Sequence, residues 1–210
     1  MENINEKTQN KDYTAYILEK CNLQVEEHPQ IKGLLSIKDF ITKEEEKILI
    51  ENIEKENWDD VLKRRTMQFG VFYNQAKKWI EQKKRPYPNY FNFLFKRLKT
   101  YNLIDYDENN ANTLINEYYP GQTLYHHKDV FGEIILGLNM LADCDLQFIN
   151  DQNKQVINVQ QPRRSLYIMT GDSRYIWKHG IMEVKKRRIS LTVRSTVPNP
   201  QKFPNLIIKN

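Results

Sequence analysis

The fold of this chain is decided by the stretch Asn116-Glu117-Tyr118-Tyr119-Pro120-Gly121, which is followed by His127-Lys128-Asp129. This stretch belongs to a series of short apolar runs that begins near Asn112, and turn-forming residues separate the runs. The expected strands cover residues 113–118, 124–125, 134–140, 145–149, 156–159, 165–169, 175–177 and 189–195. Many short strands at regular spacing are typical of a β-sandwich or a jelly roll.

Two amphipathic helices precede these strands. The segment Thr42-Lys43-Glu44-Glu45 matches a capping box, in which the Thr and Glu side chains accept hydrogen bonds from backbone N–H groups, and it predicts a helix that continues to about Glu56. A second helix follows Pro88, because apolar residues recur at helical spacing from Phe91 to Leu98. Between the helices, segment 64–73 predicts a strand and a loop, with a turn or a close backbone approach at its glycine. Helices that precede the strands predict an α+β fold, a double-stranded β-helix (jelly roll) buttressed by N-terminal helices.

Length and composition indicate a single catalytic domain. The chain has 210 residues, and we expect an extension at 1–30 with a short helix, a domain at 31–198 and a tail at 199–210. No apolar run approaches the roughly 20 residues of a membrane span, and the first residues lack the features of a signal peptide. We therefore expect an intracellular protein, in the nucleus or the cytoplasm, that does not bind a membrane. Cys21 and Cys144 lack metal-ligand spacing and are expected to be free thiols.

The charge pattern favours a partner rich in phosphate. The net charge is +5, and basic clusters lie beside aromatic residues in segments 63–73 and 77–87. For any one cluster, a solvated basic surface is the simpler interpretation. The alternation of basic and aromatic residues favours nucleic acid, with RNA ahead of DNA, because aromatic faces stack on unpaired bases.

His127 and Asp129 begin a candidate metal site. They are two residues apart, so on a strand both side chains point to one face and can share an ion. A lone His-x-Asp is common by chance, and a surface pair is the simpler interpretation unless His179 joins it from a returning strand. Two imidazoles and one carboxylate are the facial triad of non-haem Fe(II) oxygenases, which leaves metal positions open for reactants. His126 is left out because alternation turns it to the opposite face.

Arg188 and Arg194 predict an anion beside that metal. They are six residues apart in a strand-like segment, so alternation places both on the face opposite to Ile189, Leu191 and Val193. An arginine in the interior needs an anionic partner, because a buried unpaired charge is very costly. A bound carboxylate meets that need. Surface salt bridges are the weaker alternative, because the polar and apolar faces of this segment separate cleanly.

Taken together, these motifs resemble the AlkB family of Fe(II) and 2-oxoglutarate-dependent dioxygenases over residues 31–198. They occur in the family's order and near its spacing, and they are Asn116 to Gln122, His127 to Asp129, Ser173-Arg174 with His179-Gly180-Ile181, and Arg188 to Arg194. Within the family, segments 162–175 and 64–70 are most similar to the AlkB domain of enzymes that hydroxylate modified wobble uridines in tRNA.

The resemblance implies Fe(II) and 2-oxoglutarate as cofactors, and oxidation of a modified or methylated base in nucleic acid, tRNA or other RNA ahead of DNA. By this resemblance, the catalytic and iron-binding residues are His127, Asp129 and His179. The residues implied to hold 2-oxoglutarate are Asn116, Tyr118, Arg188 and Arg194. Segment 64–73 is expected to form part of a base-binding lid, with the substrate-binding residues Arg64, Arg65, Phe69 and Tyr73.

Two other functions stay open at this level. The link at 130–133 is shorter than in the nucleic-acid repair members and lacks their acidic substrate-reading residues, which permits a non-catalytic AlkB-like nucleic-acid-binding or structural subunit of a larger complex. Such a subunit could bind protein partners through the N-terminal extension and the C-terminal tail. Hydroxylation or demethylation of a protein is the second alternative. Retention of three metal ligands and both arginines favours an enzyme, because a scaffold has no need of an open metal site.

Overall fold

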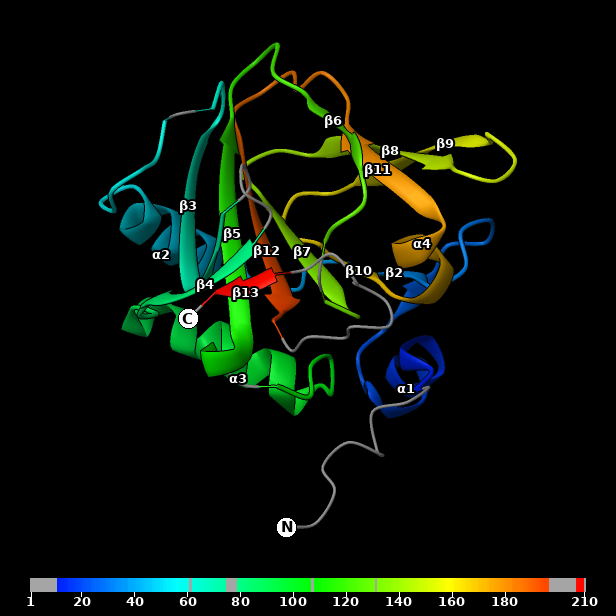
Figure 1. Ribbon diagram of the computed structural model, residues 1–210, viewed down its shortest axis with the longest axis horizontal. Coiled ribbons are helices and arrows are strands. Elements are labelled where there is room, and N and C mark those ends of the chain that lie inside the picture. The colour runs from blue at the N-terminus through cyan, green and yellow to red at the C-terminus, as the bar shows by residue number, and fades with distance from the viewer. Residues whose placement is uncertain are drawn as a thin grey trace.

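The computed structural model describes residues 11–60, 62–74, 79–106, 108–130, 132–196 and 207–209. Within these ranges the chain forms two β-sheets that pack together, and helices α2 and α3 lie beside the larger sheet (Figure 1). The strand order is β1-β2-β10-β7-β12-β5-β3-β4-β13 in the larger sheet and β6-β11-β8-β9 in the smaller one. The α+β jelly roll predicted from the sequence is confirmed.

The elements of the two sheets and their helices have the following bounds. The larger sheet contains β1 (Glu26–Glu27), β2 (Leu34–Ile37), β3 (Arg65–Asn74), β4 (Trp79–Arg85), β5 (Ala111–Tyr118), β7 (Ile135–Met140), β10 (Leu166–Met169), β12 (Arg188–Ser195) and β13 (Ile207–Lys209). The smaller sheet contains β6 (Leu124–His127), β8 (Cys144–Asn150), β9 (Val156–Gln161) and β11 (Trp177–Ile181). The helices are α1 (Tyr13–Lys20), α2 (Lys43–Ile53), α3 (Asn92–Thr100) and α4 (Gly171–Tyr175), with 3₁₀ turns at Asn89–Phe91 and Glu108–Asn110.

Two hydrophobic cores lie on opposite faces of the larger sheet. The first joins α1, α2 and α3 to the sheet and contains Ile189, Leu191 and Val193 of β12, as the alternation predicts. The second core lies between the two sheets and contains residues of both, including Tyr118 of β5 and Phe148 of β8. Because successive side chains of a strand point to opposite faces, Asn112 and Asn116 of β5 and Arg188, Ser190 and Arg194 of β12 are turned toward the interior of the jelly roll, whereas Glu117 is on the face that the helices cover.

The helix predicted at residue 42 is confirmed with its cap. Thr42 Oγ1 accepts from the Glu45 backbone N–H at 3.1 Å, and the Glu45 carboxylate accepts from the Thr42 N–H at 2.8 Å. Helix α2 ends at Ile53, earlier than the expected end near Glu56. The second predicted helix corresponds to α3. The short helix expected in the N-terminal extension is α1, and its Ile17 is buried in the first core.

The strand expected at residues 175–177 was wrong, because the short helix α4 occupies 171–175 and β11 begins only at Trp177. Local hydrogen bonds explain the difference: the Ser173 hydroxyl donates to Gly33 O at 2.8 Å, and it accepts from the Thr170 N–H at 3.1 Å. The second bond satisfies the backbone N–H of Thr170, the residue that caps the helical turn, and the first ties the turn to Gly33. The sequence did not reveal the bond to Gly33 because Gly33 is far away in the chain.

Segment 64–73 was expected to be a strand followed by a loop, but residues 65–74 form the single strand β3. Gly70 has a φ of 71°, and a Cβ added there would lie 2.2 Å from Ala111 O, so the expected close approach is confirmed. Most of the predicted C-terminal tail lies outside the described residues, apart from β13, which pairs in parallel with β4. Cys21 and Cys144 are free thiols. No helix in the described part of the chain is long and apolar enough to span a membrane.

Candidate active site

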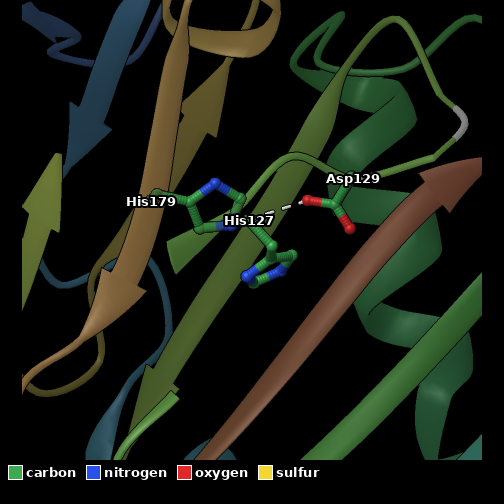
Figure 2. A group of neighbouring side chains, drawn as sticks. All are labelled: His127, Asp129 and His179. Carbon is green, nitrogen blue, oxygen red and sulfur yellow. Dashed lines mark ion pairs between the residues drawn. The ribbon is translucent and has the colours of Figure 1, made fainter. Parts of the chain in front are cut away.

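The smaller sheet brings the three candidate metal ligands together. His127 ends β6, Asp129 follows two residues later, and His179 lies opposite His127 on the neighbouring strand β11. The two imidazole centroids are 4.5 Å apart, and one ligand atom from each of the three residues lies within 4.8 Å of the others. Figure 2 shows the three side chains gathered at one place between the sheets. His126 is not a member of this group.

The protonation states of this group suit a divalent cation. Burial lowers the pKa of His179 to about 3, so its ring is neutral near pH 7 and can offer a nitrogen lone pair. Burial alone raises the pKa of Asp129, but Arg194, His179, Arg174 and His127 together outweigh it and hold that pKa well below its usual range. Asp129 is therefore a carboxylate, and its contact of 3.6 Å with His179 Nε2 joins a charged group to a neutral ring.

Arg174 of α4 holds the Asp129 segment in place. Its guanidinium donates to the backbone oxygens of Asp129 at 2.7 Å and Gly132 at 2.9 Å, and the side chain is buried. Both bonds go to the link that leaves β6, so they fix the direction in which the Asp129 carboxylate points. The sequence motif contained Arg174, but its partners are backbone atoms, and no residue pattern predicts these.

The four residues predicted to hold 2-oxoglutarate lie on neighbouring strands. In the pairing of β12 with β5, Arg188 is opposite Tyr118 and Ser190 is opposite Asn116. Arg188 is fully buried and donates to Asn139 Oδ1 at 2.6 Å. Its Nη1 and the Tyr118 hydroxyl are also buried, yet neither has a hydrogen-bond partner among the described residues. Buried polar atoms rarely lack partners, so these two groups fit the carboxylate of a ligand.

Arg194 lies at the metal end of the same face. It donates to Asp129 Oδ1 at 2.5 Å and to Asn112 Oδ1 at 2.7 Å. The Asn112 amide in turn donates to Gln68 Oε1 at 3.0 Å on β3. Arg194 therefore contacts a candidate iron ligand directly, whereas Arg188 lies six residues away along β12, beside Tyr118. Asn112 and Gln68 belong to this network, and the sequence analysis did not single them out.

The four predicted substrate-binding residues separate into two groups. Arg65 donates to the buried Glu117 at 2.5 Å, and Phe69 packs in the first core, so these two do not join the group around the predicted iron site. Tyr73 is close enough for its pKa to respond to Arg194 and Asp129, although burial is the larger cause that raises it. Arg64 donates to Asn116 Oδ1 at 2.9 Å. Tyr73 and Arg64 are therefore near the site, and Arg64 contacts a residue predicted to hold the co-substrate.

Comparisons with known proteins identify the family and the fold. The family model described as 2OG-Fe(II) oxygenase superfamily matches residues 51–194. Protein L905 of Acanthamoeba polyphaga mimivirus is 29% identical over 203 residues, which cover 84% of this chain and 91% of that protein. The solved structure of OsALKBH1 superposes with a TM-score of 0.63 at 13% identity, covering 82% of this chain and 100% of that chain, which shows a shared fold.

Two relatives are named for the modification of nucleic acid. The tRNA (carboxymethyluridine(34)-5-O)-methyltransferase alkbh8 of Xenopus tropicalis is 29% identical over 79% of this chain, but the match covers only 27% of that protein. The DNA N6-methyl adenine demethylase of Caenorhabditis elegans is 26% identical over 79% of this chain and 60% of its own length. This chain thus belongs to the AlkB family of 2OG-Fe(II) oxygenases.

Proposed function

We propose that this protein is an active dioxygenase that oxidises a modified or methylated base in nucleic acid, with tRNA or other RNA ahead of DNA. The observation that carries the proposal is the convergence of two imidazoles and the Asp129 carboxylate on one point. Beside it, Arg188 and Tyr118 direct unsatisfied polar atoms into the same interior. Family membership adds the expectation that Fe(II) and 2-oxoglutarate fill these positions.

The residues present fit both groups. When bound, iron and 2-oxoglutarate supply the oxidation of a substrate C–H bond by O₂, while 2-oxoglutarate is converted to carbon dioxide and succinate. His127, His179 and Asp129 would hold the metal on three positions and leave the others open. Arg188 and Tyr118 would hold a carboxylate at the other end of the co-substrate. Burial opposes the charged form of Asp129, and Arg194 contributes most to the opposing effect that holds the pKa of this carboxyl below its usual range.

Nucleic acid is the substrate class favoured by the net charge of the chain and by the related proteins. The net charge of +5 favours a polyanion, and the relatives whose names describe a reaction act on tRNA or DNA. The site lies between two sheets, so a base has to leave its stack to reach it. Single-stranded loops, such as those of tRNA, present bases that are already unstacked, which places RNA ahead of duplex DNA.

The test is incubation of the purified protein with Fe(II), 2-oxoglutarate, O₂ and a total tRNA pool, with separate single-stranded DNA and protein samples. We expect succinate in proportion to an altered nucleoside, detected by mass spectrometry after digestion, and neither product with Asp129→Ala. If succinate forms with the sample of candidate protein substrates but not with tRNA or DNA, the substrate is a protein and not a nucleic acid. No turnover with any sample, together with equal and negligible iron in wild type and His127→Ala, would favour a non-catalytic subunit.

A further inference from the structure

Arg64 occupies an unexpected place for a residue that was expected to bind substrate. It lies just before β3, and its Nε donates to Asn116 Oδ1 at 2.9 Å. Its guanidinium carbon lies 6.0 Å from the centre of the Tyr118 ring, and that of Arg188 lies 5.3 Å from the same ring. Two guanidinium groups from different parts of the chain therefore lie beside one tyrosine, whose buried hydroxyl lacks a partner among the described residues.

The hydrogen bond from Arg64 fixes the orientation of the Asn116 side chain. An amide has one acceptor oxygen and one donor nitrogen, so when Arg64 takes the oxygen, Nδ2 is turned to the other side as a donor. Asn116 is buried on the interior face of β5, opposite Ser190 of β12. A donor in this position suits a carboxylate, whereas the flipped amide would present an oxygen and repel one.

The neighbouring arginine shows the contrast. Arg65 forms an ion pair with Glu117, which is buried on the opposite face of the sheet, so its charge is balanced within the protein. Arg64 forms no ion pair with a carboxylate in the described part of the chain; its Nε bonds to a neutral amide. Arg188 is fully buried and also forms no ion pair with a described carboxylate, and the half-buried Arg64 adds a second positive charge beside Tyr118, so a bound anion is favoured at this end of the site.

We propose that Arg64 is a positioning residue for the co-substrate: it orients the Asn116 amide and adds positive charge beside the carboxylate that Arg188 and Tyr118 hold. This inference rests on the proposed function, because it takes 2-oxoglutarate as the ligand. It moves Arg64 from the base-binding lid to the co-substrate pocket. The start of β3 then contributes to co-substrate binding, and only the segment near Tyr73 stays close to the predicted iron on the substrate side.

The experiment measures 2-oxoglutarate binding without turnover, by anaerobic titration calorimetry on the full chain loaded with Mn(II). We expect Arg64→Gln to raise the dissociation constant by about tenfold or more, as for loss of one charge-assisted hydrogen bond. Arg65→Gln is the matched control and should change it by less than about twofold, because Arg65 faces Glu117. Arg64→Lys should restore part of the affinity, since it keeps the charge.

Two further measurements distinguish the effect of the Arg64 charge on the ligand from general damage to the fold. With 2-oxobutanoate, which lacks the second carboxylate, Arg64→Gln and wild type should bind equally. In an Asn116→Ala background, Arg64→Gln should cost less than it does alone, because the two residues act through one hydrogen bond. RNA affinity of Arg64→Gln should equal that of wild type.

Three results would overturn the inference. Unchanged 2-oxoglutarate binding with weakened RNA binding would return Arg64 to the substrate side. Equal losses for Arg64→Gln and Arg65→Gln, or an equal loss with 2-oxobutanoate, would show a structural role alone. Wild-type protein that binds no 2-oxoglutarate with Mn(II) would refute the proposed function itself, an outcome distinct from the first two.

Discussion

Replacement of Arg174 by methionine tests how the protein positions Asp129, the candidate metal-binding carboxylate. Methionine has a similar length and no charge, so with little change in volume the variant removes the hydrogen bonds that Arg174 donates to the backbone oxygens of Asp129 and Gly132, at 2.7 and 2.9 Å. Hydrogen bonds to charged groups contribute about 1.5–3 kcal/mol each. Burial lowers the pKa of Arg174, so part of that stabilisation already offsets the cost of a buried charge.

We therefore take the lower end, about 3 kcal/mol of unfolding free energy for the two bonds together. For a chain of this length, that corresponds to a melting temperature lower by roughly 6–12 °C. Freed from the guanidinium, the link after β6 no longer fixes Asp129, and loss of such a supporting contact typically weakens metal affinity by about 10–100-fold.

The assays are thermal unfolding of the metal-free protein and calorimetric titration with Fe(II) under anaerobic conditions. Arg174→Lys keeps the charge but cannot donate in the same two directions, so we expect intermediate losses in both measurements. A variant that melts at a lower temperature but binds Fe(II) as tightly as wild type would refute the reasoning, because Arg174 would then stabilise the fold without positioning Asp129.

Two further predictions concern the sheet around the site. Glu117→Gln should lower the melting temperature at pH 7, because burial opposes the Glu117 carboxylate but the hydrogen bonds from Arg65 and Arg187 outweigh it and keep its pKa below the ordinary value. That stabilisation is present above the unfolded-state pKa of about 4.3 and is lost as pH falls below it, so melting curves of the two proteins should converge in acid; a constant difference would contradict this. Gly137→Ala should destabilise the protein by about 1–3 kcal/mol in chemical denaturation, because overpacking a filled core strains it. Its new Cβ would lie 2.0 Å from Tyr167 Cζ, and an unchanged midpoint would show that the buried ring can move aside.

The two arginines of β12 could be placed on one face from their spacing because they lie on a regular strand, whereas the candidate metal ligands also needed the family resemblance. Alternation with a period of two predicts which side chains share a face, and Arg188, Ser190 and Arg194 do lie opposite the corresponding residues of β5. The apolar partners Ile189, Leu191 and Val193 lie in the first core for the same reason. The local sequence pattern is sufficient to assign the two faces of β12, because the backbone conformation is uniform over the whole strand.

Local patterns fail where the backbone departs from that uniformity. Phe69 and Tyr73 are four residues apart and would share a face on a regular strand, but Phe69 lies in the core with the helices and Tyr73 lies near Asp129. Gly70 lies between them with a positive φ, and the pairing of β3 with β4 shifts register just beyond it. A bulge of this kind turns the side chains that follow it to the other face of the strand. The presence of a glycine in the sequence does not tell whether a bulge or a turn forms there.

The contacts of Arg174 and Arg64 depend on pairs that are far apart in the chain. Arg174 is 42 residues from Gly132, and Arg64 is 52 residues from Asn116. The sequence predicts Arg64 as a substrate-binding residue and places Arg174 in a motif that resembles the family, but it gives neither the helical turn that directs Arg174 nor the strand pairing that brings Arg64 to the Asn116 amide. Both contacts could therefore be identified only from the three-dimensional structure.

The most direct test of the account is the stoichiometry of Fe(II) binding, measured anaerobically on wild type, His127→Ala and His126→Ala. His126 adjoins His127 but is not a member of the His127–Asp129–His179 group, so it serves as the matched control. We predict a single Fe(II) ion per chain in wild type and in His126→Ala, and loss of that binding in His127→Ala. Equal iron binding by the two histidine variants would contradict the account, because the metal would then not be held by His127, Asp129 and His179.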